Sequence, residues 1–194
     1  MRLLLLLALS LSIALGVGAW SALLALEQSA DLGTEQVGPW LANPLAGSVE
    51  ADPYSKARLA RIGNLTLGVG EGVVFRATRD SAGAALRREC SYGLEGQTPP
   101  ARVWTLAAFS QTGRLIQPGD GRPGWLVSRG LLRGEDNRFE IAVGPSARPG
   151  NWLAVTGEGP YVLALTLYDT PASTSSGLGD LEMPALLAKG CAVG

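Results

Sequence analysis

Hydrophobic side chains dominate the start of the chain, in an almost unbroken run from Leu3 to Leu26. The only polar side chains in this run belong to three serines, which an α-helix accommodates easily. As a helix the run would be roughly 36 Å long, enough to cross a bilayer core of about 30 Å. The pattern therefore predicts a single N-terminal transmembrane helix, with the lipid bilayer as the partner of residues 3–26.

The charges that flank this run predict its orientation. Arg2 precedes it, whereas Glu27, Asp31 and Glu35 follow it, and no basic residue appears before Lys56. Positive charge stays on the cytoplasmic side of a membrane, so we expect the N-terminus inside and the rest of the chain outside. A cleaved signal peptide is the alternative, with a weak cleavage site at Val17-Gly18-Ala19. The apolar stretch extends well beyond a usual signal-peptide core, which favours an uncleaved anchor.

The pattern changes after residue 26. Residues 27–51 are polar and punctuated by glycine and proline, which predicts a linker that leads into a domain. Asp52 followed by proline is a strong helix start, with Asp as the N-cap and Pro in the first helical position. Gly63 is a typical stop, so one short helix is expected over 53–62. Residues 52–194 are assigned to a single folded domain.

Beyond the helix, apolar positions recur with a period of two, which is typical of strands. In RFEIAV (138–143) apolar and charged side chains alternate, whereas residues 102–109 are apolar on both faces, as in a central strand. Further short strands are expected at 72–78, 84–94, 125–128, 152–156 and 161–168, and a helical turn at 184–189. This series predicts a mostly β fold, an antiparallel β-sandwich or jelly roll.

The two cysteines of the chain, Cys90 and Cys191, form an even pair. In an oxidising compartment such a pair predicts a disulfide, here closing a loop of about 100 residues. Two buried free thiols are the alternative. The expected topology places the domain outside the cytoplasm, which favours the bridge.

Composition excludes several classes of activity. The 194 residues contain no histidine, which rules out a Ser-His-Asp triad, a Cys-His nucleophile and the usual imidazole-based zinc or iron sites. We therefore predict no metal site and no cofactor. The 16 basic and 17 acidic residues nearly balance, and Arg87-Arg88 is a pair rather than a stripe, so no nucleic-acid partner is expected.

Several phrases are distinctive as a set. They are ADPYSKARLARIG (51–63), LGVGEGVVF (67–75), CSYGLEGQTPPARVWTL (90–106), RPGNWL (148–153), LYDTP (167–171) and the terminal Cys191. In these motifs the chain resembles the bacterial family known as domain of unknown function 1214, over residues 38–191. The resemblance implies a jelly-roll-like β fold in a short, membrane-anchored protein, and no established reaction. The family usually has proline at the position of Ala154, and it often has arginine at the position of Thr166. If that arginine belongs to a ligand site in the family, part of the site is lost in this chain.

Candidate ligand-binding residues are polar and aromatic side chains near loops: Arg102, Trp104, Asn151, Trp152 and Tyr168. Gly150-Asn151-Trp152 lies where a loop enters a strand, a common place for binding residues. Aromatic rings with Arg and Asn suit a sugar ring or a partner peptide. The alternative is structural, with the rings packed in the core and Asn151 satisfying loop backbone.

Carboxylates could supply a pair for glycoside hydrolysis, from Glu71, Asp80, Asp120, Asp136 and Asp169. Spacing does not show that any two of them face each other, so no catalytic residue is predicted. We expect a domain on the periplasmic side of a bacterial inner membrane that binds a glycan, lipid or protein partner without catalysis. The alternatives are an accessory subunit of a membrane complex and, less favoured, a carboxylate-dependent carbohydrate-active enzyme.

Overall fold

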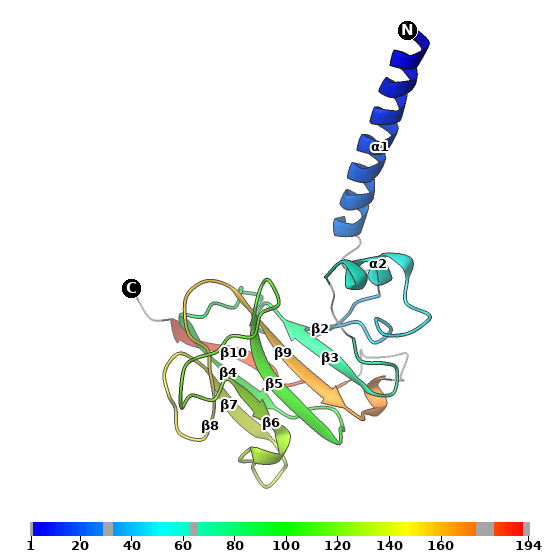
Figure 1. Cartoon of the computed structure of the whole chain (residues 1–194). Helices are drawn as coiled ribbons and strands as arrows, with labels where there is room; N and C mark the ends of the chain where they lie inside the picture. Colours follow the sequence, from blue (N-terminus) through cyan, green and yellow to red (C-terminus); the bar gives the residue numbers. More distant parts are fainter. Residues whose placement is uncertain (1, 29–32, 63–65, 174–180, 192–194) are drawn as a thin grey trace.

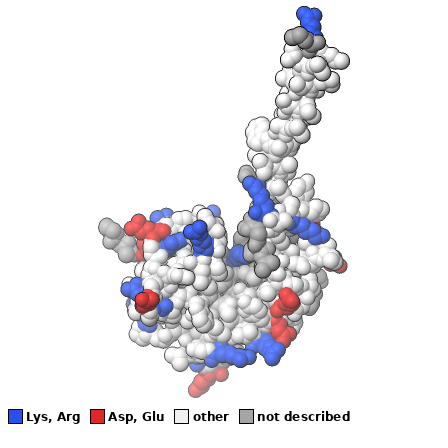
Figure 2. All heavy atoms as spheres, in the orientation of Figure 1, with Lys and Arg blue, Asp and Glu red and all other residues white. Residues whose placement is uncertain are grey.

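The computed structural model describes residues 2–28, 33–62, 66–173 and 181–191. Helix α1 (Arg2–Gln28) stands away from a β domain (Figure 1). Among the described residues, α1 holds the one segment long and apolar enough to cross a membrane, Arg2–Leu26. Figure 2 shows no charged side chain along α1 between its ends. The predicted apolar helix is confirmed, and its length and composition fit an anchor and a signal peptide alike.

Helix α2 (Pro53–Ile62) has the predicted bounds. Asp52 caps it, because its Oδ1 accepts hydrogen bonds from the backbone N–H groups of Tyr54 and Ser55, each at 2.9 Å. The hydrogen bonding from Ser55 lowers the pKa of the Asp52 carboxyl. The local signal in the sequence is therefore sufficient to place this helix.

Within the described residues the strands form two sheets. The six-stranded sheet has the order β1 (Glu35–Val37), β2 (Trp40–Ala42), β3 (Gly72–Ala77), β9 (Tyr161–Tyr168), β5 (Val103–Ser110), β6 (Trp125–Val127). The four-stranded sheet has the order β10 (Ala185–Cys191), β4 (Cys90–Gly96), β7 (Phe139–Gly144), β8 (Asn151–Ala154). The short 3₁₀ helices η1 (Ser128–Gly130) and η2 (Pro171–Ser173) follow β6 and β9.

The core lies between the two sheets. Leu163, Leu165 and Leu167 alternate along β9 with residues that face outward, and all three are fully buried. Leu94 of β4 and Ile141 of β7 join the same buried cluster from the other sheet. The predicted class is confirmed: the chain is mostly β, with two packed sheets, one short helix and an N-terminal apolar helix.

Strands β1 and β2 lie within residues 27–51, the segment assigned to the linker. β2 pairs with β3 and so extends the six-stranded sheet. Trp40 of β2 is fully buried, and its Nε1 donates a hydrogen bond to the carbonyl of Pro184 at 2.8 Å. Part of this segment is therefore integrated into the domain.

The prediction of a helical turn at 184–189 is wrong, because residues 185–189 belong to β10. The segment pairs in antiparallel register with β4 from Ala185 opposite Glu95 to Cys191 opposite Cys90. Ala, Leu and Lys favour helices locally, but a strand here completes the hydrogen bonding of β4. Tertiary pairing therefore overrides the local preference.

Strands β7 and β8 pair in parallel, unlike the other strand pairs described. Parallel neighbours usually need a crossover of a dozen or more residues, yet residues 145–150 alone connect these two. The short connection suffices because β8 begins opposite Ile141, only a few residues before the end of β7. The connecting loop consequently stays close to the sheet that it leaves.

The predicted disulfide between Cys90 and Cys191 is confirmed. The two residues are register partners in β4 and β10, with Cα atoms 3.8 Å apart. The bridge joins positions 101 residues apart in sequence. It therefore attaches the end of the described chain to the first strand of the four-stranded sheet.

We predict that Cys191→Ser lowers the melting temperature by roughly 5–15 °C. On the chain-entropy model a bridge around a loop of about 100 residues stabilises by up to about 4.7 kcal/mol, and 1 kcal/mol shifts the melting temperature of a domain of this size by about 2–4 °C. Thermal unfolding followed by circular dichroism measures the change. Reductant should lower the melting temperature of the natural chain and leave that of the variant unchanged; equal melting temperatures without reductant would contradict the prediction.

Candidate functional site

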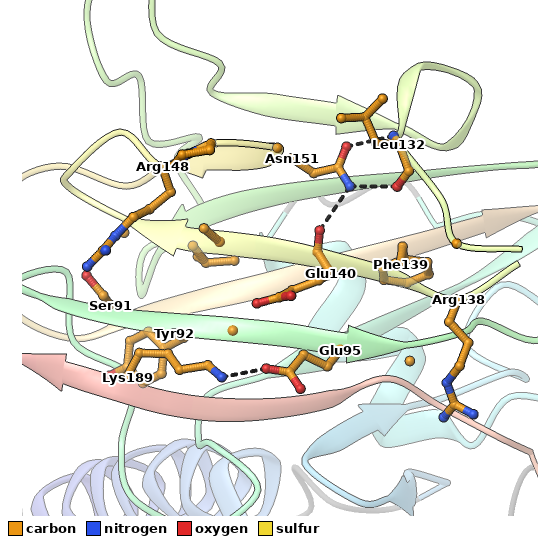
Figure 3. Close-up of a pocket in the computed structure, with 18 of the residues that line it drawn as sticks. Ser91, Tyr92, Glu95, Leu132, Arg138, Phe139, Glu140, Arg148, Asn151 and Lys189 are labelled. Carbon is orange, nitrogen blue, oxygen red and sulfur yellow. Dashed lines mark hydrogen bonds and ion pairs between the residues drawn. The ribbon is translucent and has the colours of Figure 1, made fainter. Parts of the chain in front are cut away.

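The outer face of the four-stranded sheet carries a groove of about 840 Å³ (Figure 3). Its lining comes from β4, β7 and β10, from residues 132–138 before β7, and from the 145–150 loop after it. The groove therefore lies on the face of the sheet opposite the core, where polar side chains are expected.

Small residues form the floor of the groove. Gly93, Ala142 and Gly144 line it on two neighbouring strands. A Cβ atom at Gly93 would lie 2.5 Å from Cε of Lys189, and one at Gly144 would lie 2.9 Å from Oγ of Ser91. Glycine at these two positions therefore leaves room for the neighbouring side chains and keeps the floor open.

Charged side chains surround this floor, and several are already paired. Lys189 Nζ lies 2.6 Å from Oε1 of Glu95. The hydrogen bond to Glu95 raises the pKa of the Lys189 ammonium, and the charge of Glu140 adds to the effect. Arg138 lies 3.6 Å from a carboxylate oxygen of Glu182. Exposed pairs of this kind contribute little to the stability of the domain.

Two charged groups in the groove are unpaired. Within the described residues, neither the Arg148 guanidinium nor the Glu140 carboxylate makes a hydrogen bond or ion pair. Figure 3 shows Arg148 extending from the loop across β7 toward Ser91 of β4, with Glu140 pointing into the groove farther along β7. The groove therefore presents a cation and a carboxylate above a flat floor.

Asn151 ties one wall of the groove to the sheet. Its Nδ2 donates to the carbonyls of Leu132 and Glu140 at 2.8 and 2.9 Å, and its Oδ1 accepts from the N–H of Leu132 at 2.8 Å. All three bonds are drawn in Figure 3. The predicted ligand-binding residue Asn151 thus lines the groove with its amide engaged by backbone.

The two predicted tryptophans lie outside the groove lining. Trp104 is 2% exposed and packs against the ring of Phe139, with ring centroids 5.1 Å apart. Trp152 is half-buried, and its Nε1 donates to the carbonyl of Gly144 at 3.1 Å. Trp104 therefore packs in the core, as the structural alternative proposes.

Arg102 and Tyr168 lie at one end of the larger sheet. The N–H of Arg102 donates to the carbonyl of Tyr168 at 3.1 Å, and its guanidinium lies 3.8 Å from Asp169, with both side chains exposed. The structure brings these two residues together but does not bring them to Asn151 and the groove. As ligand-binding residues, Arg102, Trp104, Asn151, Trp152 and Tyr168 stay a prediction.

Sequence reasoning did not single out the charged residues of the groove. Glu95 and Glu140 are register partners on neighbouring strands, and neither is among the carboxylates weighed from the sequence. The alternation in RFEIAV did place Glu140 on the outer face. Its neighbours depend on strand order, which the alternation alone does not contain. Among the described residues, no cluster of three or more His, Cys, Asp or Glu side chains could hold a metal ion.

A family model matches residues 71–172, a little over half of the chain. The family is DUF1214, described as a protein of unknown function. The matched range includes β3 to β9 and most of the groove, whereas α1, α2 and β10 lie outside it. No curated protein matches the chain.

Two solved structures have some similarity to the chain. The VPA0106 protein from Vibrio parahaemolyticus is 20% identical with a TM-score of 0.58, over 72% of this chain and 36% of that one. A putative uncharacterised protein from Burkholderia cenocepacia is 15% identical with a TM-score of 0.40, over 92% of this chain and 51% of that one. The chain thus spans about a third to a half of the length of these proteins. The first likeness supports the fold alone.

We predict that Asn151→Ala loosens the 131–138 segment. The variant leaves the N–H and carbonyl of Leu132 and the carbonyl of Glu140 without their side-chain partner, at a cost of about 1–3 kcal/mol in the free energy of unfolding. Hydrogen–deuterium exchange should rise in this segment. Gln111→Ala, which removes an exposed amide elsewhere, is the matched control; equal exchange in both variants would show that the three bonds do not order the segment.

Proposed function

This chain belongs to the DUF1214 family of proteins of unknown function, and we propose that it is a membrane-anchored, periplasmic binding module for acidic glycans. The ligand occupies the groove on the outer face of the four-stranded sheet. The observation that carries the proposal is the pair of unpaired charges, Arg148 and Glu140, above a floor of small residues.

The chemistry of the two unpaired groups selects the ligand class. A planar guanidinium such as that of Arg148 binds a carboxylate through two parallel hydrogen bonds. The carboxylate of Glu140 only accepts hydrogen bonds, so it suits the hydroxyl groups of a sugar. A uronic-acid oligomer offers both groups at once. A lipid acyl chain does not, because the rim is charged and Tyr92 and Phe139 turn into the core.

Hydrolysis is the second candidate function, favoured by the register of Glu95 opposite Glu140. Retaining glycosidases hold two carboxyl groups about 5–5.5 Å apart, a spacing that neighbouring strands can provide. However, Glu95 is engaged by Lys189 at 2.6 Å, and Glu140 is exposed rather than enclosed in an apolar pocket. Binding without catalysis therefore fits the groove better.

The proposed location rests on α1 and the disulfide. An apolar helix of this length fits a membrane anchor, and a disulfide persists in oxidising compartments such as the periplasm. An anchored domain with an open groove facing away from its own core could hold an envelope polymer near the membrane.

We predict that the full chain in mild detergent binds oligogalacturonate and not neutral malto-oligosaccharide, as measured by isothermal titration calorimetry. Arg148→Ala should weaken binding about 10–100-fold, because a hydrogen bond to a charged group contributes about 1.5–3 kcal/mol. Arg122→Ala, an exposed arginine outside the groove lining, is the control and should bind normally. Equal binding by Arg148→Ala and the natural chain would exclude the groove as the site.

We predict that a reporter active only in the periplasm works when it is fused after Gly194. The expectation follows from Arg2 before α1 and the acidic residues after it. Mass spectrometry of the purified chain should also find residues 1–26 retained. Activity of a cytoplasm-only reporter at the same position would reverse the orientation, and an N-terminus at Trp20 would identify a signal peptide.

A further inference from the structure

The outer face of the six-stranded sheet is unusually poor in charge. Antiparallel sheets commonly direct polar side chains to solvent on the face that is not packed on the core. On β2, β3, β9, β5 and β6 the outward positions are mostly apolar, and they include Val74, Val103, Ala107, Phe109 and Val162. Arg76 is the single charged residue among them. Apolar patches of this kind mark interaction surfaces.

One row of side chains crosses this face from strand to strand. Arg76 on β3 is the register partner of Ala164 on β9, which pairs with Ala107 on β5, which pairs with Trp125 on β6. With strands about 4.8 Å apart, Arg76 and Trp125 lie roughly 14 Å from each other. The row therefore has a cation at one end, an aromatic ring at the other and two alanines between them.

Both ends of the row are available to a partner. Trp125 is 61% exposed. The Arg76 side chain makes no hydrogen bond or ion pair within the part of the chain that the structure describes. The Arg76 side chain is exposed to solvent, and partial desolvation by the surrounding protein lowers the pKa of its guanidinium. The guanidinium stays charged at neutral pH. An aromatic face is a suitable partner for such a cation.

We propose that this face binds a second copy of the chain, with Arg76 of each subunit stacked on Trp125 of the partner subunit. A two-fold axis parallel to the strands, between β9 and β5, exchanges the two ends of the row. It brings each Arg76 over a Trp125 and sets Ala164 of one copy opposite Ala107 of the other. The small alanines let the two sheets approach closely at the axis.

Of the two in-plane axes, only the one parallel to the strands sets the cation of one copy against the aromatic ring of the other. A two-fold axis that runs across the strands would place Arg76 against Arg76 of the partner subunit, and the like charges would repel. The 25 residues of β3, β9, β5 and β6 cover about 400 Å² of sheet, at about 3.4 Å per residue and about 4.8 Å between strands. Specific interfaces bury about 800 Å² per partner. We therefore expect a dimer of modest affinity.

The test exchanges charges across the interface. In the full chain in mild detergent, sedimentation velocity over a range of concentrations should show a dimer. Arg76→Glu should weaken it roughly tenfold by removing both cation–aromatic contacts. Trp125→Lys should weaken it at least as much, because it sets a lysine against Arg76 of the partner subunit. The double variant places Glu opposite Lys twice and should restore the dimer to within about threefold of the natural chain.

One control and three contrary outcomes complete the test. Arg148→Glu, a change on the outer face of the other sheet, should leave the dimer unchanged. Each of three results would overturn the proposal. The first is a natural chain that stays monomeric, the second is single variants that dimerise normally, and the third is a double variant that dimerises no better than either single variant. A dimer held by α1 would give the second of these results, and a face that serves a different protein would give the first.

Discussion

The pairing of β10 with β4 is the constraint on which most of the domain depends. The two strands come from positions 101 residues apart and are joined covalently at Cys90 and Cys191. This pairing turns the end of the described chain into an edge of the four-stranded sheet. It also fixes Pro184, whose carbonyl accepts the hydrogen bond of the buried Trp40 from the other sheet. Both sheets are thus tied to one another through the residues that flank β10.

The groove follows from how this sheet is completed on its other side. Because β8 runs parallel to β7, the 145–150 loop must return along the sheet, and it carries Arg148 over the strands. Glycines at positions 93 and 144 leave the surface beneath it open. Asn151, at the start of β8, holds the preceding segment in place as a wall. The groove therefore depends on three features together: the parallel direction of β8, the two glycines in the floor and the side-chain amide of Asn151.

Local patterns in the sequence predicted those elements whose cause is local. Asp52 and the proline after it predicted α2 with its observed bounds, and the alternation in RFEIAV predicted which side chains of β7 face the core. The two cysteines predicted the bridge, because the apolar N-terminal run and its flanking charges placed the domain in an oxidising compartment. For residues 184–189 the local pattern gave the wrong prediction. Their composition favours a helix, but pairing with β4, which is far away in the sequence, makes residues 185–189 part of a strand.

The candidate site was harder to predict from the sequence, because its residues become neighbours only when separate strands pair. Glu95, Glu140 and Lys189 are separated by tens of residues and meet only through the register of β4 with β7 and β10. Their residue types are unremarkable on any exposed strand. Trp104 was a candidate because an aromatic ring near Arg102 suits a sugar; in the structure, alternation along β5 directs this side chain into the core.

The position of the disulfide links the groove to the redox state of the two cysteines. Lys189, which lines the groove and pairs with Glu95, stands only two residues before Cys191. In a reducing compartment the final residues of β10 are held by strand hydrogen bonds alone, at an edge of the sheet where strands fray most easily. One wall of the groove thus becomes fully anchored only after oxidation. A chain in which this bridge is reduced therefore has a groove with one wall less firmly held.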